Sequence, residues 1–262
     1  MATGVSQNRV LNCLKSRNTD SDWTIDSARN SGVLVPGPIP KSVDLRENWW
    51  DVGDQGQSGA CVGWALADSV LRWHFVKAGR IGDDEKLSVR FIWMASKEFD
   101  DYVTYPTTFI ERSGTNLKAA LMVARKYGIV TDSVLPFSLG SLYRGKETDF
   151  YSIASRLRLA GYYNLGRNLD DWKEWISKCG PVLTRLDVDS TWHSFTSHSD
   201  QMDSYYANTA QYGHAVALVG YDENRFIIRN SWGSNRWGHA GFGYASMDYV
   251  KEAFTEAYGV SI

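Results

Sequence analysis

The chain is short of cysteine, of net charge and of long apolar runs. It has three cysteines in 262 residues, a small and odd number that excludes a disulfide framework. Its 28 basic and 30 acidic side chains leave a formal charge of -2, which offers no basic surface to a phosphate backbone. No apolar run approaches the roughly 20 residues that span a bilayer. We therefore expect no nucleic-acid partner and no membrane span.

The start of the chain lacks targeting features as well. Residues 1–9 contain no basic stretch followed by an apolar one, so no secretory signal is predicted. No Asn-x-Ser/Thr acceptor occurs in the sequence. With the low cysteine count, this favours a reducing compartment, and we expect a cytoplasmic protein; export by a route without a signal peptide stays open. The sequence predicts no cofactor and no metal site.

Residues 1–39 differ in composition from the rest of the chain. They are rich in Ser, Asn, Asp and Arg, and three of the six prolines fall between Pro36 and Pro40. Proline and the residue before it disfavour helix. We therefore interpret residues 1–39 as an N-terminal extension that forms a linker with extended backbone. Residues 40–262 then form the main domain, and their length and 43% hydrophobic content are ordinary for a globular unit.

Helical patterns dominate the first half of the main domain and strand patterns the second. Apolar periodicity, capping residues and terminal glycines predict helices at 61–77, 88–99, 116–127 and 168–180. Alternating or β-branched runs predict strands at 182–188, 214–221 and 225–229, with a hairpin turn at 222–224. This segregation predicts an α+β fold with two lobes, one helical over about 45–130 and one of β structure over about 131–262.

A run of small, turn-forming residues leads to Cys61, the first residue of a predicted helix. A thiol there faces free backbone N–H groups and the positive end of the helix dipole, and both favour a nucleophilic thiolate. A buried structural cysteine is the commoner fate of a free thiol, so this stretch alone leaves both interpretations open.

His214 and Asn230 lie at the ends of two neighbouring predicted strands. The hairpin between these strands brings them close together, and an Asn beside a His can fix the orientation of the ring. Taken singly, His214 is equally consistent with a hydrogen-bonded strand-edge residue and Asn230 with a turn residue.

The order Cys61, His214, Asn230, with Gln55 six residues before the cysteine, resembles the papain-like cysteine peptidases. The resemblance covers most of residues 40–262. Further matching stretches are Pro40 to Arg46, Leu87-Ser88, Tyr127-Gly128-Ile129, Gly180-Pro181-Val182 and Trp237-Gly238.

The resemblance implies a role for each of these residues. Cys61 would be the nucleophile, His214 the general base and acid, and Asn230 the residue that orients His214. Gln55 would donate to the oxyanion, and Trp232 would shield the Asn230–His214 pair from water. Gly114, Thr115, Gly213 and Trp232 would contact the substrate. The implied fold has a helical left lobe, an antiparallel barrel-like right lobe and the active site in the cleft between them.

The chain departs from the family pattern at several positions. Ser58 and Arg112 stand where the family usually has a disulfide pair, which implies a disulfide-free member. Val62 replaces the usual Trp after the nucleophile. Thr115 replaces a Gly, and because a β-branched residue resists positive φ, pairing with a substrate strand would be altered.

The resemblance implies a thiol endopeptidase that acts on peptides or proteins and could meet a protein inhibitor. Residues 1–39 are shorter than the family's usual pro-segment. They are either a packed linker or an autoinhibitory segment, with Val33-Leu34-Val35 near the cleft. Two alternatives stay open, namely an acyl-transfer enzyme of transglutaminase or ligase type on the same fold, and a non-catalytic binding module.

Overall fold

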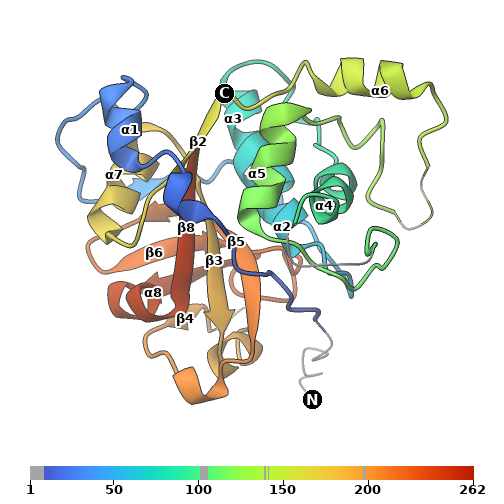
Figure 1. Ribbon diagram of the computed structural model, residues 1–262. Coiled ribbons are helices and arrows are strands. Elements are labelled where there is room, and N and C mark those ends of the chain that lie inside the picture. The colour runs from blue at the N-terminus through green and yellow to red at the C-terminus, as the bar shows by residue number, and fades with distance from the viewer. Residues whose placement is uncertain (1–8, 101–105, 139, 141, 197–198) are drawn as a thin grey trace.

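A helical lobe lies against one face of an antiparallel sheet in the computed structural model, and three further helices cover the other side (Figure 1). The structure describes residues 9–100, 106–138, 140, 142–196 and 199–262. The α+β class and the papain-like arrangement of two lobes are as predicted. Among the described residues, no helix combines the length and apolar character needed to cross a membrane.

The helical lobe is built from helices whose ends are set by local sequence. One continuous helix comprises α2 (Cys61–Gly63), η2 (Trp64–Leu71), which has π-helical backbone bonds, and α3 (Arg72–Lys77). It is followed by α4 (Val89–Lys97), α5 (Leu117–Lys126) and α6 (Glu147–Ala154). The side chains of Ser88 and Asn116 cap α4 and α5 as expected. The short helix α6 was not predicted.

The sheet carries the second lobe. Within the described residues it has eight strands, ordered β2-β8-β3-β5-β6-β7-β4 with β1 beside β5, so it stays open where a barrel-like sheet was expected. All pairs are antiparallel except β4 with β7. The strands are β1 (Val43–Asp44), β2 (Gly161–Asn164), β3 (Val182–Val188), β4 (Gln201–Met202), β5 (Tyr212–Tyr221), β6 (Arg225–Arg229), β7 (Phe242–Ser246) and β8 (Phe254–Ser261). Helices α7 (Leu169–Lys178) and α8 (Met247–Ala253) pack on the face away from the helical lobe.

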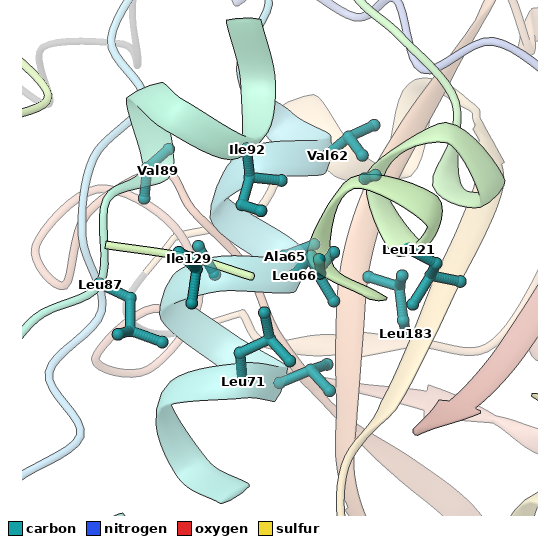
Figure 2. Close-up of a cluster of buried hydrophobic side chains, with 14 of the residues drawn as sticks. Val62, Ala65, Leu66, Leu71, Leu87, Val89, Ile92, Leu121, Ile129 and Leu183 are labelled. Atoms are coloured by element: carbon teal, nitrogen blue, oxygen red, sulfur yellow. The ribbon is translucent and has the colours of Figure 1, made fainter. Parts of the chain in front are cut away.

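Strand β5 divides two hydrophobic cores because its side chains alternate between the faces of the sheet. Ala215, Ala217 and Val219 belong to the core shared with the helices, whereas Val216 and Leu218 belong to the core under α7 and α8. Figure 2 shows the first core, to which Leu66 of the long helix, Leu121 of α5 and Leu183 of β3 all contribute.

The helical core extends past the expected lobe boundary at residue 130. Val134, Phe137, Phe150 and Leu159 all pack in it, because the chain after α5 folds back over α4. The rings of Phe91 and Phe150 meet edge to face at 5.2 Å. This contact joins two residues that are far apart in the sequence, and it helps to hold α6 on the helical lobe.

The N-terminal extension has two parts. Residues 9–16, which we call the cleft segment, run between β5 and the helical lobe, as the dark blue trace in Figure 1 shows. Residues 17–39, the anchor segment, wrap around the sheet lobe and contain helix α1 (Ile25–Asn30), where an extended linker was expected. Thr24 caps α1 in a capping box, a local signal that outweighs the prolines after it. Residues 1–8 of the extension lie outside the described residues.

Candidate active site

Cys61 opens the long helix at the junction of the two lobes. The loop before it is held from both sides, since Gly59 N–H donates to the carbonyl of Glu111 and Gln55 N–H donates to that of Ser231. The side chains of Cys61 and His214 are both buried. The sequence-predicted cysteine therefore lies at a helix start and beside the sheet, as the proposed chemistry requires.

His214 on β5 and Asn230 at the end of β6 meet across the paired strands. Nε2 of His214 lies 2.8 Å from Oδ1 of Asn230. Because Oδ1 only accepts hydrogen bonds, Nε2 carries a proton and donates a hydrogen bond to Asn230. The ring centroid of Trp232 lies 5.2 Å from that of His214, and Trp192 approaches it edge-on at 5.7 Å. Two indoles thus exclude water from the imidazole.

The thiol of Cys61 contacts the side chains of Cys13 and His214. Since Nε2 of His214 is engaged with Asn230, Nδ1 is the ring nitrogen that is left for the sulfur. The contact with Cys13 is the strongest influence on the pKa of Cys61 and lowers it, burial opposes this, and His214 and the Ala215 N–H lower it further. The net effect is a pKa well below the usual thiol value, which favours the nucleophilic thiolate form of Cys61.

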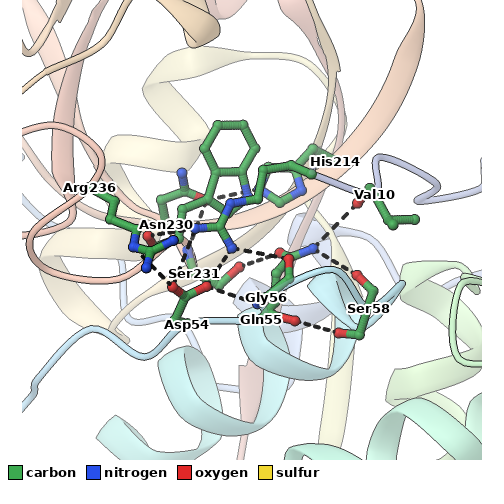
Figure 3. Close-up of polar contacts among 11 residues, drawn as sticks. Val10, Asp54, Gln55, Gly56, Ser58, His214, Asn230, Ser231 and Arg236 are labelled. Carbon is green, nitrogen blue, oxygen red and sulfur yellow. Dashed lines mark hydrogen bonds and ion pairs between the residues drawn. The ribbon is translucent and has the colours of Figure 1, made fainter. Parts of the chain in front are cut away.

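Gln55 is oriented by its neighbour on the Asn230 loop. The hydroxyl of Ser231 donates to Oε1 of Gln55 at 2.8 Å, which fixes Nε2 as the end that faces the cleft. Nε2 donates to the carbonyls of Ser58 at 3.1 Å and of Val10 at 3.3 Å (Figure 3). Ser231 was not singled out from the sequence, and its role depends on a contact between residues that are far apart in the chain.

The cleft segment contacts all four residues that the resemblance implied for substrate contact. Cys13 N–H donates to the carbonyl of Gly213 at 2.9 Å, and Leu14 N–H donates to that of Thr115 at 3.0 Å. Arg9 donates to the carbonyl of Trp232 at 3.1 Å. At Gly114, a Cβ atom would lie 2.1 Å from the carbonyl oxygen of Asn12, so only glycine leaves room for the segment there.

Thr115 does not prevent strand pairing, contrary to the expectation from its β-branched side chain. It is absent from the described non-glycine residues with positive φ, so its backbone accommodates a β-branched residue without strain. Its carbonyl accepts the Leu14 N–H within a parallel bridge between Leu14 and Asn116. The altered pairing that the sequence suggested is therefore not seen for the segment that fills the cleft.

The carbonyl of Cys13 is turned away from the oxyanion donor. It accepts a hydrogen bond from Nε of the buried Arg185 at 3.0 Å, while the amide of Gln55 is engaged with Val10, three residues earlier. Cys13 thus contacts the Cys61 sulfur, whereas Gln55 binds the carbonyl of a different residue, Val10. Arg185 and Cys13 were not identified as site residues from the sequence.

Val33-Leu34-Val35, which the autoinhibitory alternative placed near the cleft, packs elsewhere on the body, as the linker alternative had it. Leu34 is fully buried in the core under α7, and the backbone N–H groups of Val33 and Leu34 donate to the carbonyl of Ala28. An apolar run at this position serves the packing of α1. Among the described residues, no group of three or more His, Cys, Asp or Glu side chains converges to hold a metal ion.

Comparisons with known proteins give a family match over most of the chain. The family model described as "Papain family cysteine protease" matches residues 39–259. The chain is 26% identical over 223 residues to vignain of Vigna mungo, covering 79% of this chain and 55% of that protein. It is 24% identical to digestive cysteine proteinase 1 of Homarus americanus, covering 83% and 58% respectively. The chain thus spans a little over half the length of the curated relatives it matches.

Solved structures show the same fold. Xylellain, a cysteine protease from Xylella fastidiosa, superposes with a TM-score of 0.78 at 21% identity, covering 97% of this chain and 96% of that one. Digestive procathepsin L 3 of Tenebrio molitor gives a TM-score of 0.71 at 20% identity, covering 97% and 77%. At such identities the likeness concerns the fold alone.

Proposed function

Because the chain belongs to the papain family of cysteine proteases, we propose that it is a cysteine endopeptidase whose cleft segment inhibits it. The observation that carries this proposal is the linked arrangement of Cys61, His214 and Asn230, with Gln55 aimed into the same cleft. A cleft that binds a peptide of its own chain through main-chain carbonyls supports a peptide as substrate.

The proposed reaction uses each residue at a stated atom. The thiolate of Cys61 attacks the carbonyl carbon of the scissile bond, and Nε2 of Gln55 donates to the oxyanion that develops. Protonated Nδ1 of His214 gives its proton to the leaving amine, and a thioester forms on Cys61. Water then attacks the thioester while Nδ1 takes up one of its protons; the C–S bond breaks, the acid leaves, and the Cys61 thiolate beside protonated Nδ1 is restored. Asn230 holds the ring in place through Nε2.

Inhibition by the cleft segment follows from what it occupies. The cleft segment is hydrogen-bonded to the amide of Gln55 and to the carbonyls of Gly213 and Thr115, and it covers Cys61. A substrate therefore has to displace it. It is not presented for cleavage, because the carbonyl of Cys13 is bound to Arg185 and not to the oxyanion donor. This fits a latent enzyme, and it moves the inhibitory element from Val33-Leu34-Val35 to residues 9–16.

The test uses a variant that begins at residue 17 and so keeps the anchor segment. We expect it to hydrolyse a peptide substrate, and Cys61→Ala in the same background to lose about 10⁴-fold or more of this activity with folding intact. Asn230→Ala should lose less, about 10²-fold, because His214 remains but is poorly oriented. Turnover that persists in Cys61→Ala, or transfer to an added amine in place of hydrolysis, would contradict the proposal.

A further inference from the structure

The sulfur atoms of Cys13 and Cys61 meet in the filled cleft. Their side chains are hydrogen-bonded to each other, and both are buried. The backbone of Cys13 is hydrogen-bonded on both sides of its Cα. Its N–H donates to the Gly213 carbonyl at 2.9 Å, and its carbonyl accepts from Nε of Arg185 at 3.0 Å. The contact is therefore a feature of how the cleft segment binds and not a chance rotamer of a surface cysteine.

The surroundings of the two thiols shift their pKa values in opposite directions. Burial raises the pKa of Cys13 well above its usual value, and the adjacent Cys61 raises it further, whereas the pKa of Cys61 is lowered. These opposite shifts favour a thiol at Cys13 and a thiolate at Cys61. A thiolate with a second thiol in contact is the arrangement from which disulfides form by exchange.

We propose that Cys13 and Cys61 form a reversible disulfide that locks the cleft segment over the active site under oxidising conditions and releases it on reduction. This inference rests on the proposed function, because it regulates the same cysteine. The disulfide would convert displaceable hydrogen-bonded inhibition into a covalent block.

The oxidant is a low-molecular-weight disulfide of the glutathione type. While the cleft segment is lifted, the Cys61 thiolate attacks one sulfur of the small disulfide; a Cys61–glutathione disulfide forms and one glutathione thiolate leaves. When the segment returns, Cys13 loses its proton and its sulfur attacks the Cys61 sulfur, and the second glutathione leaves as a thiol. Two protein thiols are oxidised and one small disulfide is reduced to two thiols.

Cys179 provides an internal control. It lies beside the anchor segment, with Sγ 3.7 Å from the carbonyl oxygen of Val33, and packs against the core on the other face of the sheet. Burial raises the pKa of Cys179 to about 11, so it is a poor nucleophile. The expected oxidation product therefore keeps one free thiol of three, and that thiol belongs to Cys179.

The experiment treats the full chain with oxidised glutathione, alkylates the remaining thiols and digests the protein with trypsin without reduction. The three cysteines fall in separate tryptic peptides, 10–15, 47–72 and 179–185. We expect the first two as one linked peptide, a fall from three free thiols to one, and return of both peptides on reduction. Cys179→Ser should give the same linked peptide.

A wild-type protein that yields only glutathione adducts, or a link to Cys179, would overturn the disulfide. Cys13→Ser should give a glutathione adduct on Cys61 and no link. The reduced Cys13→Ser protein separates the two proposals: if it hydrolyses peptide while the wild type never cross-links, only the disulfide is wrong. If the link forms but no reduced protein hydrolyses peptide, even when it begins at residue 17, the proposed function is wrong and the disulfide stands.

Discussion

The two parts of the N-terminal extension are held by different forces. The anchor segment buries Ile25, Ala28 and Leu34, and Arg29 forms ion pairs with two acidic side chains of α7 at 2.6 Å. In the cleft segment only Cys13 is buried. Leu11 packs partly against the core under α7, but most contacts of the segment are hydrogen bonds, one ion pair and the stacking of Arg9 over the Trp232 ring. Apolar burial holds the first part, whereas polar contacts hold the second.

This difference separates a permanent attachment from a replaceable one. Main-chain hydrogen bonds to Gly213 and Thr115 can be offered by any extended peptide, so a substrate can take over what the cleft segment leaves. The side chains of Ile25 and Leu34 fill defined space in a core, and no substrate replaces them. An extension built in this way can release the active site without leaving the protein.

Removing the two parts separately should give the largest effect. A variant that begins at residue 17 should fold and gain about 10²-fold in activity over the full chain, because the segment's hydrogen bonds contribute about 0.5–1.5 kcal/mol each. A variant that begins at residue 40 also loses three buried side chains, of which each large one contributes about 1.5–3 kcal/mol. We expect it to melt far lower or to fail to fold.

Thermal unfolding by circular dichroism and peptide turnover measure both variants. Equal melting temperatures for the variants starting at residues 17 and 40 would show that the anchor segment is as dispensable as the cleft segment. Unchanged turnover in the variant starting at residue 17 would show that residues 9–16 do not inhibit.

A matched pair of leucines sharpens the comparison. Leu34→Ala should lower the free energy of unfolding by about 2–5 kcal/mol, because Leu34 is fully buried. Leu14→Ala should cost less than about 1 kcal/mol and leave inhibition in place, because Leu14 is only partly buried and acts through its backbone N–H. Denaturant unfolding of the two variants is the measurement; equal losses would contradict the distinction.

Features set by neighbouring residues were predictable from the sequence. Ser88, Asn116 and Asn168 cap three helices as expected, and the terminal glycines Gly79 and Gly128 have positive φ. The grouping of Cys61, His214, Asn230 and Gln55 was reached through resemblance to a family and not through local pattern. The helix ends were thus indicated by residues within one or two turns, and the four site residues by their order along the chain.

The cleft segment was not predictable in the same way. Arg9 meets Asp54, Asn12 meets Gly114 and Cys13 meets Cys61, and no local pattern records such distant contacts. Polar residues at the start of a chain are typical of a disordered tail. Helix α1 was missed for another reason, because the prolines that follow it dominated the interpretation of the whole extension.

The smallest expected effect concerns the ion pair of the cleft segment. Although burial alone would raise it, the pKa of Asp54 is held below its usual value by Arg9, with help from the Gly56 N–H. A carboxyl whose pKa is lowered in the bound state stabilises that state above its usual pKa, and the stabilisation is lost as the pH falls through the lowered value. Binding of the cleft segment should therefore weaken below about pH 4, near the usual pKa of Asp.

The ratio of two variants isolates this effect from other titrations. An ion pair near the surface contributes about 0.2–1 kcal/mol. Near pH 6 its loss should therefore account for about a 1.4- to 5-fold faster labelling of Cys61 by an epoxide inhibitor in Arg9→Ala than in the wild type, on top of the effect of losing the carbonyl contacts. The ratio should fall toward that set by the carbonyl contacts of Arg9 with Gly56 and Trp232 as the pH approaches about 3. In an Asp54→Asn background it should stay constant. A ratio in the native background that does not change with pH would place the contribution of Arg9 in its carbonyl contacts and not in its charge.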